Sequence, residues 1–174
     1  MRRQRNAVGV LVKVSMVVLL LVACESVAAA GCGTALQAVE LGRLSNTLYQ
    51  VDHRLLSRAA DLNTAIAQGG ATVDRTGDAE RLYGVVILGM QVQTSVDRLA
   101  VLTQLRDLMR QAQDRAVVAG AISSFATSAA DVSAKASTRL AAKDAWPRSP
   151  DLAADTQHVH DLVRQIAALL SSCR

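Results

Sequence analysis

Apolar residues recur at steps of three and four along most of the chain after residue 34, which is the spacing of one face of an α-helix. Four such stripes follow one another. They predict helices over about residues 34–68, 78–118, 122–144 and 150–172, and therefore an all-α fold. The first stripe is the most regular and consists of Leu41, Leu44, Leu48, Val51, Leu55, Ala59, Leu62 and Ile66.

Helix-breaking residues separate the first and the last of these helices from their neighbours. Gly69 and Gly70 end the first helix, and residues 71–77, ATVDRTG, predict a loop. The sequence DAWPRSP, residues 144–150, contains both prolines of the chain. Ser149 within it is a suitable N-cap for the last helix, because a proline follows at the first helical position.

The break in the long middle segment is less marked. Glycine and serine both disfavour a helix interior, and Gly120, Ser123 and Ser124 lie between the second and third stripes. We therefore expect a turn within residues 115–124, with residues 94–95 as the alternative. Four helices with short connections would form an antiparallel up-and-down bundle.

The chain has three cysteines, Cys24, Cys32 and Cys173. An up-and-down bundle with an even number of helices brings its two ends together, so Cys32 and Cys173 could form a disulfide if their Cα atoms come within about 7 Å. An intermolecular bridge and two free thiols are the alternatives. The expected fold is thus a four-helix bundle closed by an N-to-C-terminal disulfide.

The first 30 residues have the composition of an export signal. Arg2, Arg3, Arg5 and Lys13 precede or begin an apolar run of ten residues, 14–23. This run is about half of the ~20 residues that cross a bilayer as a helix. A permanent span is therefore the weaker interpretation, and a cleaved signal is favoured.

The sequence Leu21-Val22-Ala23-Cys24 resembles the lipobox of bacterial lipoproteins. The resemblance implies a signal peptide over residues 1–23, lipid on Cys24 and a tether over residues 24–33. Because Glu25 rather than aspartate follows the cysteine, the resemblance also implies the outer membrane.

Small residues at Ala28, Ala29 and Ala30 offer a second cleavage position, after residue 30. That cut would release a soluble periplasmic or secreted domain instead of a lipid-anchored one. Either product would enter an oxidising compartment, where thiols pair.

Net charge indicates no polyanionic partner once the export signal is set aside. The chain has nineteen Lys and Arg and fifteen Asp and Glu. Residues 1–30 hold four of these bases and one acid, which leaves fifteen bases and fourteen acids. Nucleic-acid binding would require a basic face on the folded domain, so no nucleic-acid partner is expected.

Residues capable of chemistry are few. His158 and His160 lie two positions apart and point to different sides of a helix, so they cannot hold one metal ion together. Asp151, Asp155 and His158 share a face, but acids are common in a first helical turn without any ligand. His53 has no serine or cysteine nucleophile matched to it in the sequence. We expect no catalytic residue and no metal site.

Residues 126–137, ATSAADVSAKAS, have small side chains that bury little area each. Close packing of this helix against its neighbours is one interpretation. The other is a loose helix that offers a surface to a partner.

Met90 and His160 could be axial ligands of haem within a bundle, but methionine on an apolar helix is usually core filler. The sequence therefore favours a non-catalytic, lipid-anchored envelope protein without a cofactor, which binds an envelope protein partner through a helix face. Two copies of the chain could also pair. A carrier of haem or another small ligand is the alternative function.

Overall fold

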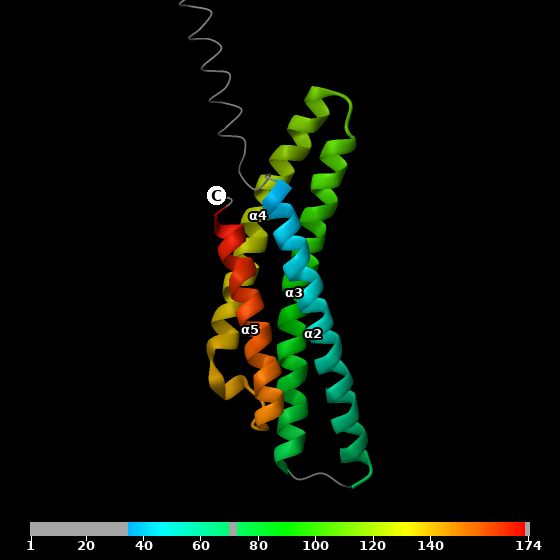
Figure 1. Ribbon diagram of the computed structural model, residues 1–174, viewed down its shortest axis with the longest axis vertical. Coiled ribbons are helices and arrows are strands. Elements are labelled where there is room, and N and C mark those ends of the chain that lie inside the picture. Colours follow the sequence, from blue (N-terminus) through cyan, green and yellow to red (C-terminus); the bar gives the residue numbers. More distant parts are fainter. Residues whose placement is uncertain (1–34, 70–72, 173–174) are drawn as a thin grey trace, which may run out of the picture. The chain divides into compact units, whose positions relative to one another are not determined.

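The computed structural model describes residues 35–69 and 73–172, in which all regular structure is helical (Figure 1). The elements are α2 (Ala35–Ala67), α3 (Val73–Leu108), α4 (Ala112–Ala141), the short 3-10 helix η1 (Lys143–Ala145) and α5 (Pro150–Ser171). The expected all-α fold with four long helices is confirmed for this part of the chain. Cys24, Cys32 and Cys173 lie outside the described residues, so lipidation and the disulfide remain predictions.

The four helices form an up-and-down bundle (Figure 1). Each helix packs on the next one along the chain, and α5 also packs on α2, which closes the bundle. A hydrogen bond of 3.4 Å from Gln37 Nε2 to Ser172 Oγ joins the start of α2 to the end of α5. The first and last described turns therefore lie side by side, as an even number of helices requires.

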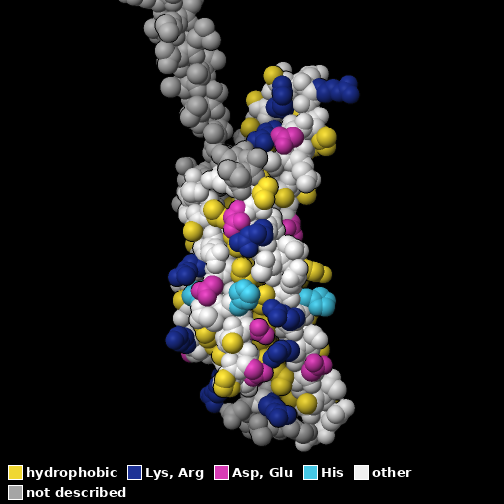
Figure 2. Space-filling model, in the orientation of Figure 1, with side chains coloured by type: hydrophobic (Ala, Val, Ile, Leu, Met, Phe, Trp, Pro, Cys, Tyr) yellow, Lys and Arg dark blue, Asp and Glu magenta, His cyan; other side chains and the backbone are white. Residues whose placement is uncertain are grey.

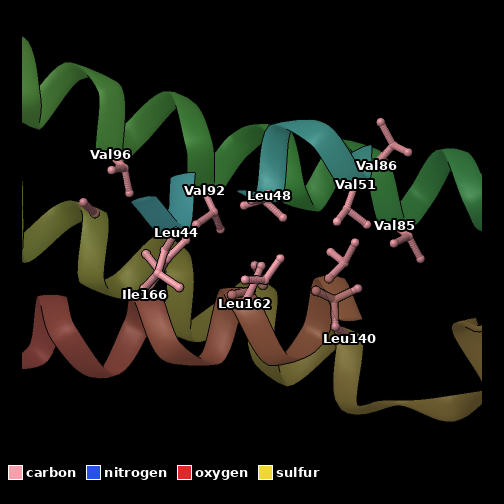
Figure 3. Packing of buried hydrophobic residues seen from close by; sticks show 14 of the residues in the cluster. Leu44, Leu48, Val51, Val85, Val86, Val92, Val96, Leu140, Leu162 and Ile166 are labelled. Carbon is pink, nitrogen blue, oxygen red and sulfur yellow. The ribbon is translucent and has the colours of Figure 1, made fainter. Parts of the chain in front are cut away.

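Aliphatic residues from all four helices fill the interior of the bundle. The stripe of α2 from Leu41 to Ala59 is buried as predicted, and it joins one cluster with buried residues of the other helices. Figure 3 shows Leu48 of α2, Leu140 of α4 and Ile166 of α5 pointing into this shared interior. Full burial of such a side chain contributes about 1.5–3 kcal/mol, so the shared core is the main source of stability.

Helix α4 packs through small residues. Its buried positions include Ala126, Ala129, Ala130, Ser133 and Ala136. The Ser133 hydroxyl donates a hydrogen bond of 2.8 Å to the carbonyl oxygen of Ala129, so it can be buried without a partner on another helix. Close packing, one of the two interpretations of residues 126–137, is thereby confirmed.

The predicted loop over residues 71–77 is wrong from Val73 onward, because α3 begins there. Gly69 adopts a left-handed φ of 75°, which ends α2. No further loop-forming residues are needed for that helix to end. Residues 73–77 can therefore join α3, where Gly77 costs only about 1 kcal/mol of helix propensity.

The predicted turn near Gly120 is also wrong, since the chain reverses at residues 109–111. Leu99 is the last buried residue of α3, and Ile122 is the first of α4. Antiparallel packing of these two stripes requires a reversal midway between them, which is where it occurs. Gly120 is an exposed residue within α4, and residues 94–95, the alternative position, lie inside α3.

A buried carboxylate holds the connection between α4 and α5. Asp78 of α3 accepts hydrogen bonds from the backbone N–H of Arg148 (2.6 Å) and of Ser149 (3.1 Å), and from the Ser149 hydroxyl (2.6 Å). Ser149 occupies the N-cap position and Pro150 begins α5, as predicted. The hydroxyl of Ser149 binds Asp78, however, instead of capping the helix.

Two of the described helices, α3 from Arg75 to Leu108 and α4, are long and apolar enough to cross a membrane. This criterion uses length and composition alone, and the core helices of a bundle also meet it. Both helices contribute buried residues to the shared core. Their composition is therefore only a weak indication of a membrane span.

Candidate functional site

The acidic face at the start of α5 binds an arginine. Asp151 Oδ2 lies 2.9 Å from Arg58 Nη1 on α2, and Asp155 Oδ2 lies 3.8 Å from Nε of the same arginine. The two carboxylates thus join α5 to α2. Among the described residues, no group of three or more His, Cys, Asp and Glu side chains could hold a metal ion.

Met90 and His160, the two residues considered as haem ligands, both lie outside the hydrophobic core. Met90 is 52 % exposed on α3. His160 is half-buried beside Trp146, with ring centroids 6.4 Å apart in an edge-to-face arrangement. Trp146 Nε1 in turn donates a hydrogen bond of 2.6 Å to the carbonyl oxygen of Leu140, at the end of α4.

The end of the α3–α4 hairpin, residues 100–121, lies beyond the last fully buried residues of α3 and α4, and we call it the hairpin end; Leu102 and Val118 within it are partly buried against the core. In Figure 1 it extends past the start of α2 and the end of α5. None of its residues is fully buried, and four of its large apolar residues, Val101, Leu105, Leu108 and Val117, are 41–79 % exposed. Two helices can bury only the faces that they turn toward each other, so apolar surface remains uncovered here.

A groove of about 500 Å³ connects the hairpin end to the first turns of α2. Its lining is mostly apolar and consists of Ala38, Val39, Leu41, Gly42, Val96, Leu99, Ala100, Thr103, Gln104, Arg106 and Asp107. Figure 2 shows basic, acidic and hydrophobic side chains interspersed over the hairpin end. The surface of the hairpin end therefore combines exposed apolar side chains with charged side chains of both signs.

A second candidate site surrounds Asp52 of α2, which is only 3 % exposed. Neither of its carboxylate oxygens has a hydrogen-bond partner among the described residues. An uncompensated buried charge is destabilising by about 3–5 kcal/mol. Asp52 is thus a buried acid that no structural partner accounts for.

Gly89 of α3 provides the space for this carboxylate. A Cβ atom at position 89 would lie 2.5 Å from Oδ1 and 2.7 Å from Cγ of Asp52, closer than real Cβ atoms approach. Gly84, in the same helix, has open space around it. Asp52 can therefore lie against α3 because position 89 has no side chain.

Asp52 lines a cavity of about 290 Å³ between α2 and α3, which we call the Asp52 cavity. Its lining consists of Tyr49, Asp52, His53 and Leu56 from α2, and Val86, Met90, Gln93, Thr94 and Asp97 from α3. The lining thus has two carboxylates, and it includes no lysine or arginine from the described part of the chain. Asp97 Oδ1 accepts a hydrogen bond of 3.0 Å from the Ser45 hydroxyl, and the rings of Tyr49 and His53 lie 6.1 Å apart.

Burial raises the pKa of Asp52 to about 7, so its protonation changes near neutral pH. Asp78 shows the opposite behaviour. Burial alone would raise its pKa, but hydrogen bonds from Ser149 and from the backbone N–H of Arg148, together with the charge of Arg81, hold that pKa below its ordinary value. Hydrogen-bond donors make the difference between the two buried acids.

Sequence pattern alone directed attention to His53 as a candidate and not to its neighbour Asp52. His53 is exposed, as its position off the apolar stripe indicates. Asp52 follows Leu48 by four residues and precedes Leu55 by three, so it is in phase with the buried stripe. That phase is the signal that could have identified it.

Compared with protein-family models, curated proteins and solved structures, the chain shows no significant match.

Proposed function

We propose that the chain is an exported, lipid-anchored envelope protein that binds another protein, without catalysis, through the hairpin end. The observation that carries this proposal is the exposed apolar surface of residues 100–121, where no side chain is fully buried. Large exposed apolar surface on a folded domain is typical of an interaction site.

The charges of the hairpin end favour a protein as the partner. Three arginines and two aspartates lie between residues 106 and 115. Anionic lipid attracts a cluster of basic residues, whereas these charges nearly cancel. Arginine and methionine among apolar residues are typical of protein–protein interfaces, and Met109 and Arg110 lie at the turn of the hairpin.

Cross-linking tests the interface. A photo-reactive amino acid at position 108, where Leu108 is 79 % exposed, should form one discrete adduct with another protein in intact cells. The added substitution Val117→Asp should abolish this adduct. The control Ile87→Asp changes an apolar residue that is 53 % exposed on α3 outside the hairpin end, and it should leave the adduct intact. No adduct, or an adduct that Ile87→Asp removes equally, would contradict the proposal.

The lipobox-like sequence around Cys24 supports attachment to the periplasmic side of a membrane, with the outer membrane favoured. A tether of residues 24–33 would keep the bundle near membrane components and raise its effective concentration for a weak partner. Intact-mass spectrometry of the mature protein separates the alternatives. Acyl chains on Cys24 support the anchor, and a chain that starts at Gly31 contradicts it.

A further inference from the structure

We propose that the Asp52 cavity binds a small organic ammonium ion, with its charged nitrogen against the carboxylate of Asp52. The carbon chain of the ligand would lie against the apolar side chains of Leu56, Val86 and Met90. This site is distinct from the hairpin end and does not depend on the function proposed for it.

The first reason is the state of the Asp52 carboxylate. Only 3 % of the residue is exposed, and both carboxylate oxygens lack hydrogen-bond partners among the described residues. Neither oxygen is accessible to solvent, so a ligand reaches them only when a lining side chain moves aside; a primary ammonium, which carries three N–H donors, could then bind both. Charge-assisted hydrogen bonds of this kind are about twice as strong as neutral ones.

The second reason is the charge around the cavity. From α2, the titratable groups that line it with Asp52 are Tyr49 and His53, and from α3 the only one is Asp97. The lining is therefore acidic, and neither lysine nor arginine of the described helices takes part in it. An anionic ligand would be repelled, and a neutral ligand would leave the carboxylate without a counter-charge.

The third reason is the apolar share of the lining, which favours an organic cation over a metal ion. Among the described residues, no group of three or more His, Cys, Asp and Glu side chains could hold a metal ion, and about half of the cavity lining that α2 and α3 provide is apolar or aromatic. The aromatic ring of Tyr49 and the chains of Leu56 and Met90 suit the carbon part of an alkylammonium ion. The volume of about 290 Å³ is enough for a short alkyl chain.

Titration with n-butylammonium at pH 8, followed by amide chemical shifts, tests the proposal. Saturable shifts are expected at residues of α2 and α3 that line the cavity. n-Butanol and n-butyrate, which match the chain length without the positive charge, should bind at least tenfold more weakly. Equal binding of n-butanol would overturn the proposal, because the cavity would then recognise only the carbon chain.

Variants locate the binding site. Asp52→Asn should weaken n-butylammonium binding at least tenfold, while Asp61→Asn, at an exposed acid of the same helix, should leave it unchanged. Gly89→Ala should also weaken binding, because a Cβ there displaces the carboxylate. Gly84→Ala, where space is open, should not. Binding that survives Asp52→Asn would refute the proposal.

Acid gives a readout in the unsubstituted protein. At pH 5.5 Asp52 is mostly protonated, so n-butylammonium should bind at least tenfold more weakly than at pH 8. Asp52→Asn has no acid to protonate at position 52, so its weak binding of n-butylammonium should be the same at both pH values. A tenfold pH dependence that persists in Asp52→Asn would assign the effect to another group of the lining and overturn the role of Asp52.

Discussion

Asp52 and Asp78 are buried on adjacent helices, yet folding has opposite effects on their protonation. Asp78 is surrounded by hydrogen-bond donors, so the bundle favours its ionised form and gains stability above the ordinary pKa of a carboxyl group. Asp52 has no donor among the described residues, so the bundle favours its protonated form. The stability linked to Asp52 is therefore present in acid and lost as the pH rises.

The first prediction concerns this pH dependence. The pKa of Asp52 rises from 3.8 to about 7 on folding. The free energy of unfolding should therefore fall between pH 4 and pH 7, relative to Asp52→Asn, by up to about 4 kcal/mol. Urea unfolding of both proteins across this range measures the difference. A constant difference would show that Asp52 is solvated or paired in the folded protein.

The second prediction concerns Asp78→Ala. This substitution leaves the N–H groups of Arg148 and Ser149 without the carboxylate that binds them. We expect a loss of about 2–4 kcal/mol in the free energy of unfolding, since hydrogen bonds to a charged group are lost in a buried place. Asp61→Ala, at an exposed site, should change it by less than about 0.5 kcal/mol. Similar effects of both variants would contradict the role of Asp78.

At the residue scale, the position of an acid within the helical repeat was enough to predict that it is buried, but not which groups surround its carboxylate. Phase places Asp52 on the buried face of α2, and the sequence of that helix alone shows this. The space that its carboxylate occupies depends on Gly89, which is 37 positions later. The donors around Asp78 likewise come from a connection about 70 residues away. Such pairings follow from tertiary packing, which a single sequence does not contain.

At the scale of the element, α3 has two interior glycines with different surroundings. Gly84→Ala should raise the free energy of unfolding by about 0.5–1 kcal/mol, because alanine is the better helix former and nothing obstructs its Cβ. Gly89→Ala should gain less or destabilise, since its Cβ meets the Asp52 carboxylate. The third prediction is this inequality, measured by urea unfolding.

The double variant with Asp52→Ala and Gly89→Ala provides the control. Without the carboxylate, alanine at position 89 should recover the gain seen at position 84. If Gly89→Ala stabilises as much as Gly84→Ala in the unsubstituted protein, Asp52 does not lie against α3.

The fourth prediction follows from the continuity of α4. Gly120 is helical and exposed, with no atom near the place of a Cβ. Gly120→Ala should therefore stabilise the protein by about 0.5–1 kcal/mol. If Gly120 instead lay in a turn with positive φ, Gly120→Ala would destabilise the protein. Thermal unfolding of this variant therefore also tests where the hairpin reverses.

Apolar periodicity predicted the helices well and the reversal between α3 and α4 poorly. The stripes persist because each buried face repeats every three to four residues. Residues 109–111 include no glycine or proline, so the local sequence marks no turn there. The reversal is set by the pairing of the stripes that end at Leu99 and begin at Ile122, which is a property of two packed helices.

At the scale of the whole molecule, closure of the bundle brings its ends together. Gln37 and Ser172 are hydrogen-bonded across α2 and α5, and Cys32 and Cys173 lie five residues before and one residue after them in sequence. This proximity supports the predicted disulfide, which itself lies outside the described residues.

The fifth prediction tests that disulfide. Reduction should lower the free energy of unfolding by up to about 4–5 kcal/mol, the chain-entropy value for a loop of this length. The double variant Cys32→Ser and Cys173→Ser should be equally destabilised and insensitive to reductant. An unfolding midpoint that reductant leaves unchanged in the native protein would show that the two thiols are not paired.

The number of helices and the closure of the bundle could be predicted from the sequence, because length, breakers and periodicity leave few other arrangements. The Asp52 cavity and the hairpin end could not. The Asp52 cavity depends on Gly89 of α3 facing Asp52 of α2. The hairpin end exists because α3 and α4 continue past α2 and α5 (Figure 1). The types of side chain along the chain do not by themselves specify either arrangement.

Trp146 is the single tryptophan of the chain, and it lies at the connection between α4 and α5, which Asp78 holds against α3. Its intrinsic fluorescence is therefore a local optical probe of one end of the bundle, free of overlapping signals from other indoles. Far-UV circular dichroism, by contrast, averages over every helical turn. Recording both during one denaturation distinguishes concerted melting from early fraying of the hairpin end, without any introduced label.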